Sequence, residues 1–363
     1  MKVLVMGGSR FNGLALVQEL AAAGHDVSVV NRGQSGGDLP DGVRRLVADR
    51  TDHGRLGEVL AGQDFDCVHD VSAYHPEDVE VMIELLDGRV GHYVFVSSTV
   101  IYAATDILPI TEDHPVDRSA EQSEYGLHKL LCEDLLLTAH HRRRFPATIV
   151  ALSMVFGPRN IVADREQRMM ARLLAGRPVL IPGDGTTLGQ VGYVDDQARA
   201  LRMMMGRSST FGRRYNLTGN QYFSDHGYVD TLAAVVGVDA RKVSIPAGLM
   251  DQLWDHHAVL SEGATPAGAD MAASGSRTGD RVIRQRYVLS GLIPRIAPNL
   301  HRWNRSVLFS TERLRQDVGW VPEVNFRTMA ENTYEWFCRQ PAAHRTRFDF
   351  SWEDDLADQV AGQ

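Results

Sequence analysis

The sequence predicts an α/β protein built on a doubly wound parallel sheet, with a smaller mixed domain toward the C-terminus. The first observation is the order of elements in residues 1–32. An apolar strand at 2–6, a glycine-rich turn at 7–13, a helix at 14–23 and a second strand at 27–30 follow one another directly. Strands that are apolar along their whole length are typical of parallel sheets, because both faces of such sheets are covered.

The same alternation of strands and helices continues to about residue 152. Further strands are expected at 43–48, 66–71, 92–96 and 147–152, with helices ending at Leu60 and spanning 76–86 and 125–141. Asp52 and Ser123 are of the residue types that cap helices, and Pro76 suits a first helical turn. Because the carboxyl ends of parallel strands meet at one edge, a ligand is expected there.

The turn at 7–13 predicts a dinucleotide site of the Rossmann type. Glycines let the backbone approach a pyrophosphate, whose charge faces N–H groups and the next helix N-terminus. Gly7 and Gly13 take the outer positions of a G-x-x-G-x-x-G spacing, and Arg10 takes the middle one. The expected cofactor contacts are Gly7, Ser9, Arg10, Phe11, Asn12 and Gly13 in the turn, Asn31, Arg32, Asp49, Arg50, Val71, Ser72 and Ala73 at later strand ends, and Tyr125 and Lys129 on a later helix.

Composition and charge argue against several classes of protein. The chain has 363 residues, of which 44% are hydrophobic and 23% charged, the balance of an ordinary globular protein. The net charge of −8 disfavours nucleic acid as a partner. The sequence holds no apolar run of the ~18 residues that a membrane span needs and no leading targeting segment, so a cytoplasmic location is expected. Cys67, Cys132 and Cys338 lack metal-ligand spacing, and no metal site is expected.

The second half of the chain is less regular. Helices are expected near 167–174, 196–205, 228–236 and 326–337, with strand-like runs at 179–181 and 191–194. We assign 1–165, with a returning segment at about 187–217, to the dinucleotide-binding domain, and 166–186 with 218–340 to a substrate domain. Residues 261–280 are expected to form a long solvated loop, in preference to an active-site lid. The tail, 341–363, is either docked on the protein or a subunit contact.

Ser98, Tyr125 and Lys129 form a coherent acid–base set. Tyr125 and Lys129 stand four residues apart, hence on one face of a predicted helix, and Ser98 follows a predicted strand. Tyr125 would exchange a proton with a substrate hydroxyl or carbonyl while hydride moves to or from a nicotinamide. A tyrosine with a pKa of about 10 is a poor base at neutral pH, so the Lys129 ammonium is expected to favour the phenolate. Ser98 would hold the substrate oxygen.

In this setting the chain resembles the extended short-chain dehydrogenase/reductase family, the NAD-dependent epimerase/dehydratase group. Matching segments are GGSRFNG at 7–13, VSA at 71–73, VFVSSTVIY at 94–102, YGLHK at 125–129, VFGPRN at 155–160, YVDD at 193–196 and STERLRQDVGWVP at 310–322. The resemblance extends to about Phe337. It implies a Rossmann fold, an NAD(P) cofactor, a homodimer formed through two helices of each subunit, and Ser98 as the catalytic hydroxyl, with Thr99 the nearest alternative.

The resemblance also bears on the substrate, which it implies is a sugar or a nucleotide sugar. Family members that eliminate water carry Asp and Glu after the catalytic hydroxyl, where this chain has Thr99 and Val100, so elimination is not expected. Family enzymes for nucleotide sugars tend to carry an Asn where we align Met154 and an arginine where we align Gly189, which makes an ordinary nucleotide sugar less expected. The expected substrate contacts are Tyr74, Thr99, Met154 and Arg159.

We therefore expect an NAD(P)-dependent epimerase or oxidoreductase that acts on a hydroxyl or carbonyl of a sugar or sugar-like small molecule. One alternative is a simple NADPH-dependent ketone reductase of secondary metabolism. A non-catalytic RNA-binding protein is an alternative of another class, because the GGSRF turn resembles a branch that includes chloroplast stem-loop-binding proteins. The negative net charge and the intact set of Ser98, Tyr125 and Lys129 argue against it.

The end of the second predicted strand favours NADP over NAD. An NAD enzyme places Asp or Glu there to bind the adenosine ribose 2′-hydroxyl, whereas this chain has Asn31 and Arg32. Arg32 can pair with a 2′-phosphate, and Arg10 can add a second positive charge. NAD is the alternative, because an asparagine can hydrogen-bond a ribose hydroxyl and because epimerases of the family generally retain NAD.

Overall fold

A seven-stranded parallel sheet organises the N-terminal part of the computed structural model, which describes residues 1–34, 39–261, 281–293 and 302–362. Its strands lie in the order β11-β6-β5-β4-β1-β2-β3. The strand order changes side between β1 and β4: the chain adds β2 and β3 on one side of β1 and the later strands, from β4 on, on the other. The strands are β1 (Lys2–Met6), β2 (Asp26–Asn31), β3 (Arg44–Val47), β4 (Cys67–Asp70), β5 (Tyr93–Ser98), β6 (Ala147–Leu152) and β11 (Arg214–Leu217). Ligands bind at such a change of side in open α/β sheets.

Helices cover both faces of the sheet, as a doubly wound fold requires. One face carries α1 (Phe11–Ala22) and α6 (Val194–Met204), and the other carries α2 (His53–Leu60), α3 (Pro76–Leu86) and α4 (Glu124–Arg143). Val3 and Val5 belong to the core under α1, while Leu4 and Met6 belong to the core under α3. The strand is therefore buried on both faces, which explains its unbroken apolar run.

The predicted helix starts agree with the structure. The Asp52 carboxylate accepts a hydrogen bond from the Arg55 N–H at 3.0 Å, and the Ser123 hydroxyl accepts one from the Gly126 N–H at 2.9 Å. These bonds satisfy backbone donors that a helix leaves free at its first turn. They fix the start of α4, the helix that carries Tyr125.

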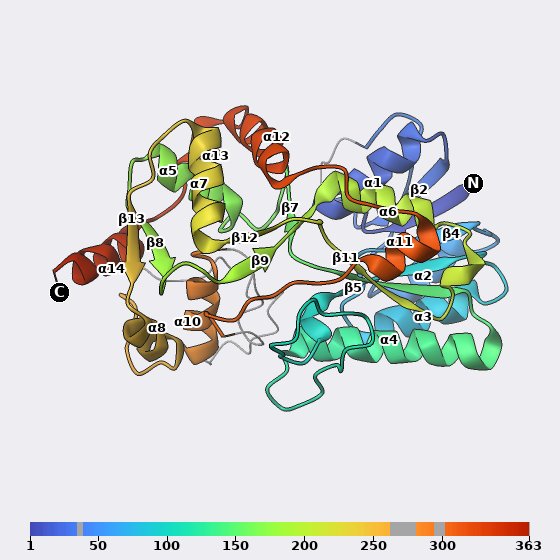
Figure 1. The fold of residues 1–363 in the computed structure, drawn as a ribbon. Coiled ribbons are helices and arrows are strands. Elements are labelled where there is room, and N and C mark those ends of the chain that lie inside the picture. The colour runs from blue at the N-terminus through green and yellow to red at the C-terminus, as the bar shows by residue number, and fades with distance from the viewer. Residues whose placement is uncertain (35–38, 262–280, 294–301, 363) are drawn as a thin grey trace.

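The second lobe is smaller and mixed (Figure 1). Its helices are α5 (Glu166–Leu174), α7 (Asp225–Val236), α8 (Ala247–Trp254), α10 (Arg281–Ser290), α12 (Phe326–Cys338), α13 (Ala342–Arg345) and α14 (Ser351–Ala361), while α11 (Glu312–Val318) packs on β11. Short strand pairs complete it: β7 (Val155–Phe156) with β10 (Gly192–Tyr193), β9 (Leu188–Gln190) with β12 (Tyr222–Ser224), and β8 (Val179–Pro182) with β13 (Lys242–Ile245). Short 3₁₀ turns lie at Thr99–Ile101 and Ser208–Thr210.

The sequence reading of this lobe was wrong in places. The strand expected at 191–194 is only two residues long, because Val194 already begins α6. The short strand β7 was not predicted, and neither were the helices α8 and α10. The predicted loop at 261–280 lies, apart from Ser261, outside the described residues. Short elements escape detection because their pairing partners are distant in the sequence.

The C-terminal segment is docked on the smaller lobe, one of the two roles left open by the sequence. The Phe350 ring lies 5.1 to 5.6 Å from the guanidinium carbons of Arg168, Arg172 and Arg177. Trp352 is buried, and Glu353 forms ion pairs with Arg168 and Arg172. Apolar burial and paired charges together hold this segment against α5.

Candidate active site

The glycine turn lies against the end of β4 with no room for side chains. Gly7 has a φ of +108°, and a Cβ there would approach the Ser72 Cβ to 2.9 Å. A Cβ at Gly13 would lie 3.0 Å from the Gly8 backbone. Both positions therefore require glycine. Arg10 stands at the N-cap of α1, and because its guanidinium carries only donors, it cannot satisfy the first N–H groups of that helix.

Two buried polar atoms beside this turn fit a polar ligand. Within the described residues, Asn12 Oδ1 and Asn31 Nδ2 have no hydrogen-bond partner, although Asn31 Oδ1 accepts a bond from the Gly33 N–H at 2.9 Å. Such groups are costly to bury unless something binds them. The tight glycine turn and these two atoms are consistent with a dinucleotide in this crevice.

Charged side chains surround the end of β2 and β3. Arg10 and Arg32 are exposed. The pKa of Asp49 is lowered, mainly by hydrogen bonds from the backbone and hydroxyl of Thr51 and further by nearby Arg32. Arg32 therefore lies within electrostatic range of Asp49, close to where the adenosine end of a dinucleotide would bind.

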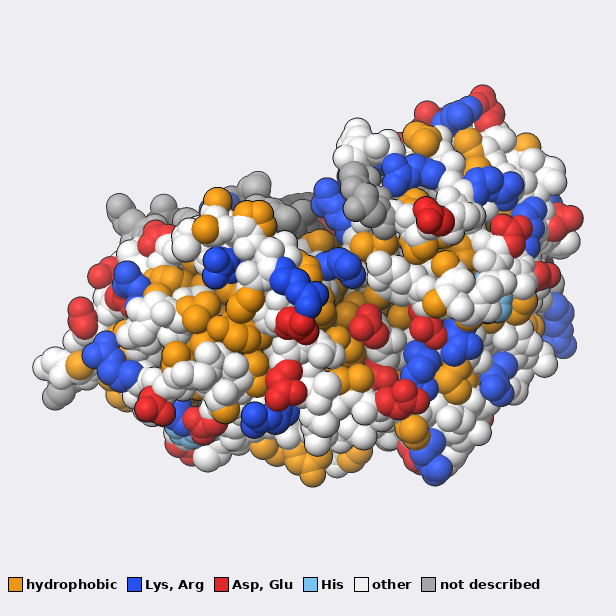
Figure 2. Space-filling view, turned by 90° about the horizontal axis from the view of Figure 1, so that it is seen from above, with side chains coloured by type: hydrophobic (Ala, Val, Ile, Leu, Met, Phe, Trp, Pro, Cys, Tyr) orange, Lys and Arg blue, Asp and Glu red, His pale blue; other side chains and the backbone are white. Residues whose placement is uncertain are grey.

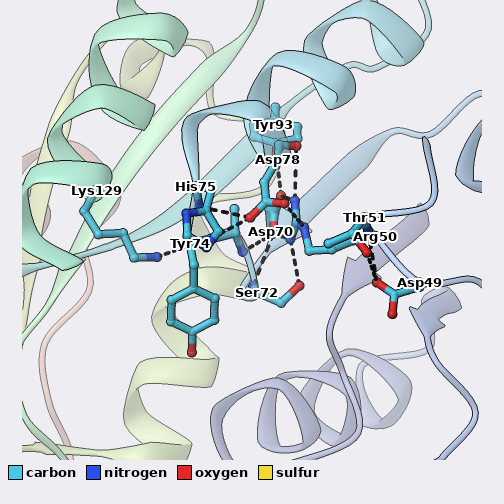
Figure 3. Close-up of polar contacts among 11 residues, drawn as sticks. Asp49, Arg50, Thr51, Asp70, Ser72, Tyr74, His75, Asp78, Tyr93 and Lys129 are labelled. Carbon is cyan, nitrogen blue, oxygen red and sulfur yellow. Dashed lines mark hydrogen bonds and ion pairs between the residues drawn. The ribbon is translucent and has the colours of Figure 1, made fainter. Parts of the chain in front are cut away.

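The structure gives Arg50 protein partners where the sequence predicted a cofactor contact. Its guanidinium is ion-paired with Asp70 and Asp78, and it donates to the Ser72 hydroxyl at 2.9 Å (Figure 3). Burial opposes its charge, but the two carboxylates outweigh this and raise the pKa of Arg50. The prediction missed this because Asp78 lies on α3, far along the chain.

Ser98, Tyr125 and Lys129 are brought together at the ends of β5 and α4. Ser98 lies near enough to Tyr125 to lower the pKa of its hydroxyl. The Lys129 Nζ lies 5.6 Å from the Tyr125 ring centroid and donates to the backbone carbonyls of Ala73 at 2.7 Å and Val96 at 2.8 Å. Lys129 is thus fixed by two strand ends that face the glycine turn.

Burial dominates the electrostatics of the set. Burial and then the neighbouring Tyr74 raise the pKa of Tyr125, and the groups that act against this are Ser98 and the positive charge of Arg165. Burial also lowers the pKa of Lys129 to about 8. Ser98 and Arg165 thus oppose the rise in the pKa of Tyr125 without cancelling it, and the effect expected of Lys129 stays a prediction. Arg165 was missed, because no motif marks it.

The predicted substrate contacts fall into two groups. Tyr74 is 46% exposed, and its ring centroid lies 5.9 Å from that of Tyr125, so it borders the catalytic set. Thr99 follows Ser98 but is buried, which makes it a poorer candidate for the reacting hydroxyl. Met154 packs partly on the core, and Arg159 is exposed and interacts electrostatically with Asp195.

A buried ion pair joins α4, the helix that carries Tyr125, to the central sheet. Glu133, on α4, pairs with Arg214, on β11, and accepts a hydrogen bond from the Ser97 hydroxyl at 2.5 Å. Glu133 is 1% exposed, so its charge requires these partners. The bond from Ser97 joins α4 to β5 beside Ser98.

Two absences characterise the described part of the chain. No helix there is long and apolar enough to cross a membrane. Among the same residues, no group of three or more His, Cys, Asp or Glu side chains is placed to hold a metal ion.

The fold and site define a class of protein, and a family comparison agrees with it. Residues 3–218 match the model of the NAD dependent epimerase/dehydratase family, and the chain belongs to that family. The resemblance inferred from the motifs is therefore confirmed.

The relatives of this chain carry names that describe three different activities. The chain is 30% identical over 249 residues to chloroplast stem-loop binding protein of 41 kDa b from Arabidopsis thaliana, covering 65% of this chain and 63% of that protein. It is 28% identical over 253 residues to 2'-dehydrokanamycin reductase from Streptomyces kanamyceticus, covering 68% and 70%. A UDP-glucose 4-epimerase from Lactobacillus helveticus is 32% identical over 164 residues, covering 38% and 47%. The match thus spans less than two thirds of the first relative and about half of the third.

Solved structures confirm the fold class. An epimerase from Methanothermobacter thermautotrophicus superposes with a TM-score of 0.68 at 20% identity, over 93% of this chain and 91% of that one. A UDP-glucose 4-epimerase from Thermotoga maritima also gives a TM-score of 0.68 at 20% identity, over 93% and 99%. At such identities the likeness establishes the doubly wound architecture alone.

Proposed function

We propose that this protein is an NAD(P)-dependent epimerase or oxidoreductase that acts on a hydroxyl or carbonyl of a sugar or sugar-like small molecule. The observation that carries the proposal is the meeting of Ser98, Tyr125 and Lys129 beside the glycine turn. Family membership, with relatives named as sugar epimerases and as a dehydrokanamycin reductase, supports it. The lobe built from 166–186 and 218–340 would supply substrate contacts in addition to Tyr74, Thr99, Met154 and Arg159.

Each side chain of the set has a task in this reaction. During reduction the Tyr125 hydroxyl gives its proton to the substrate oxygen, and during oxidation it takes the proton back. The Ser98 hydroxyl holds that oxygen, and the Lys129 ammonium stabilises negative charge that develops on Tyr125. NAD(P), when bound, supplies or accepts the hydride. Because Thr99 and Val100 carry no carboxylate, elimination of water is not proposed.

The test of this function is a comparison of cofactor use with sugar conversion. An epimerase would retain a nucleotide through purification and interconvert UDP-glucose and UDP-galactose without net change at 340 nm. A reductase, the function favoured by the dehydrokanamycin reductase relative, would consume NADPH in proportion to an added oxo-sugar. A protein that binds neither NAD nor NADP in such assays would contradict both.

RNA binding is the second candidate, favoured by the relative named as a stem-loop binding protein. The chain carries a net charge of −8, and Figure 2 shows acidic and basic side chains interspersed over the face that it presents. Non-specific affinity for nucleic acid requires clustered positive charge. A stem-loop RNA that binds more tightly than either dinucleotide, and still does so at about 200 mM salt, would favour this candidate over the enzyme.

We expect NADP to bind more tightly than NAD, with Arg32 responsible for the difference. Arg32 and Arg10 are exposed at the strand ends, where a 2′-phosphate can pair with a guanidinium. Replacing Arg32 with Ala should weaken NADP binding about tenfold or more and leave NAD nearly unchanged, as measured by calorimetric dissociation constants. Wild-type preference for NAD, or an equal loss for both cofactors, would refute this role of Arg32. Asp49 near Arg32 makes the result sensitive to salt.

We also propose a homodimer formed through α3 and α4, which pack side by side. Leu127 and Leu131 are each 37% exposed on α4, an unusual position for two leucines on one helix face. Replacing Leu131 with Glu should shift the mass measured by light scattering from that of two chains to that of one. A wild-type protein that is already monomeric would contradict the proposal.

A further inference from the structure

The Arg50 guanidinium is bound inside the protein by two carboxylates, a hydroxyl and a carbonyl. Its four terminal N–H groups donate to Asp70 Oδ1 at 2.9 Å, Asp70 Oδ2 at 3.0 Å, the Ser72 hydroxyl at 2.9 Å and the Asp78 carbonyl at 3.1 Å. The remaining nitrogen, Nε, lies 3.0 Å from Asp78 Oδ1. That contact is an ion pair without hydrogen-bond geometry, so four of the five guanidinium donors of Arg50 are bonded within the protein and the fifth faces a carboxylate.

The two carboxylates that Arg50 joins hold the turn at 72–75 by its backbone. Asp70 Oδ1 accepts the N–H groups of Ser72 at 3.2 Å and Ala73 at 3.0 Å. Asp78 Oδ2 accepts those of the next two residues, Tyr74 at 2.9 Å and His75 at 3.0 Å. Four successive backbone donors are thus satisfied by one carboxylate–arginine–carboxylate cluster.

The opposite side of this turn holds Lys129. The Ala73 carbonyl accepts a hydrogen bond from the Lys129 Nζ at 2.7 Å, and that nitrogen lies 5.2 Å from the Tyr74 ring centroid. Figure 3 shows Arg50 and Lys129 on the two sides of the turn, with Tyr74 between them. The position of the lysine acceptor is therefore set by the same turn that the Arg50 cluster fixes.

We propose that Arg50 is a positioning residue for Lys129, acting through the turn at 72–75, and that it makes no direct contact with the cofactor. The inference rests on the proposed function only in treating Lys129 as part of the catalytic set. Removing one partner of a buried ion pair leaves the other charges uncompensated. Loss of the guanidinium would leave Asp70 and Asp78 with like charges and release the turn that supports the Lys129 acceptor.

Two variants and a matched control separate positioning from simple stability. Arg50→Gln removes the bridge, and Asp78→Asn weakens it from α3, so that any effect on Lys129 must pass through the turn. Arg89→Gln is the control, because Arg89 donates to the carbonyls of Leu60, Gln63 and Leu85, before β4 and at the end of α3. The Arg89→Gln replacement removes several hydrogen bonds, none of which involves the turn at 72–75.

The chain makes the readout simple, because it contains only three lysines, Lys2, Lys129 and Lys242. In protein labelled with ¹³C-lysine, the Lys129 side-chain signal should shift in Arg50→Gln and Asp78→Asn, while Lys2 and Lys242 stay in place. Amide exchange at 72–75 should rise about tenfold or more, and the NADP dissociation constant should change less than about threefold. Arg89→Gln should lower the melting temperature without moving the Lys129 signal.

Two results would overturn the proposal. A large loss of NADP affinity in Arg50→Gln with an unmoved Lys129 signal would make Arg50 a direct cofactor contact. Lower melting temperatures in both variants with an unmoved signal would make the cluster merely structural. If Arg50→Gln does not fold, Asp78→Asn decides by the same readouts. None of these measurements requires turnover, so an error in the proposed reaction would leave the result interpretable.

Discussion

Replacing Tyr125 with Phe should lower kcat about a hundredfold or more while cofactor affinity and melting temperature stay close to those of the wild type. The change deletes only the hydroxyl that would carry the proton, and general acid–base catalysis contributes about 10²–10⁴ in rate. The phenyl ring keeps its contacts with Tyr74 and with the Lys129 Nζ. A large loss confined to kcat would therefore identify the lost proton carrier.

The matched control for this variant is Tyr74→Phe. Tyr74 is a neighbouring phenol that is 46% exposed, and loss of its hydroxyl changes the polarity of the site without removing the hydroxyl of Tyr125. We expect it to alter KM more than kcat, as measured by steady-state rates with the substrate that the cofactor and sugar assays identify. Near-normal turnover by Tyr125→Phe, or an equal loss in both variants, would rule out Tyr125 as the proton carrier.

The stability of the wild type, relative to a Lys129→Met variant, should rise by about 2 kcal/mol between pH 7 and pH 10. Burial lowers the pKa of Lys129 from its ordinary 10.5 to about 8 in the folded protein. Between these values the unfolded chain binds more protons than the folded one, so the free energy of unfolding increases with pH. Below about pH 8 the buried ammonium costs stability in full.

Urea unfolding at several pH values measures this difference directly. Other titrating groups are common to both proteins and cancel in the comparison. The range stops at pH 10, because the raised pKa of Tyr125 makes stability fall at still higher pH, where unfolded tyrosines ionise first. Parallel pH profiles for wild type and Lys129→Met would show that Lys129 keeps an ordinary pKa in the folded state.

Local signals allowed much of the sheet and its helices to be predicted. The strand at Lys2–Met6 was recognisable because its residues are buried on both faces, and the starts of α2 and α4 because Asp52 and Ser123 bond to their own first turns. Helix spacing brought Tyr125 and Lys129 to one face. Each of these inferences depends on residues within one element and its flanks.

Interactions between distant elements could not be predicted. Arg50 reads as one more positive charge at a strand end, and only the folded chain brings Asp78 within 3.0 Å of it. Similarly, the acceptors of the Lys129 ammonium are backbone carbonyls, whose positions no residue type reveals. The sequence located the candidate site but not the hydrogen bonds and ion pairs that hold its side chains in place.

The docked C-terminal segment has a consequence for the order in which the protein is made. Arg168 and its partner Glu353 are separated by 185 residues, which at about 5–20 residues per second take roughly 10–40 s to synthesise. Until then Arg168, Arg172 and Arg177 lie near one another without the carboxylates of α14, and their like charges repel. The growing chain can thus assemble the strands up to β6 early, whereas the packing of the smaller lobe is completed only after α14 has been synthesised.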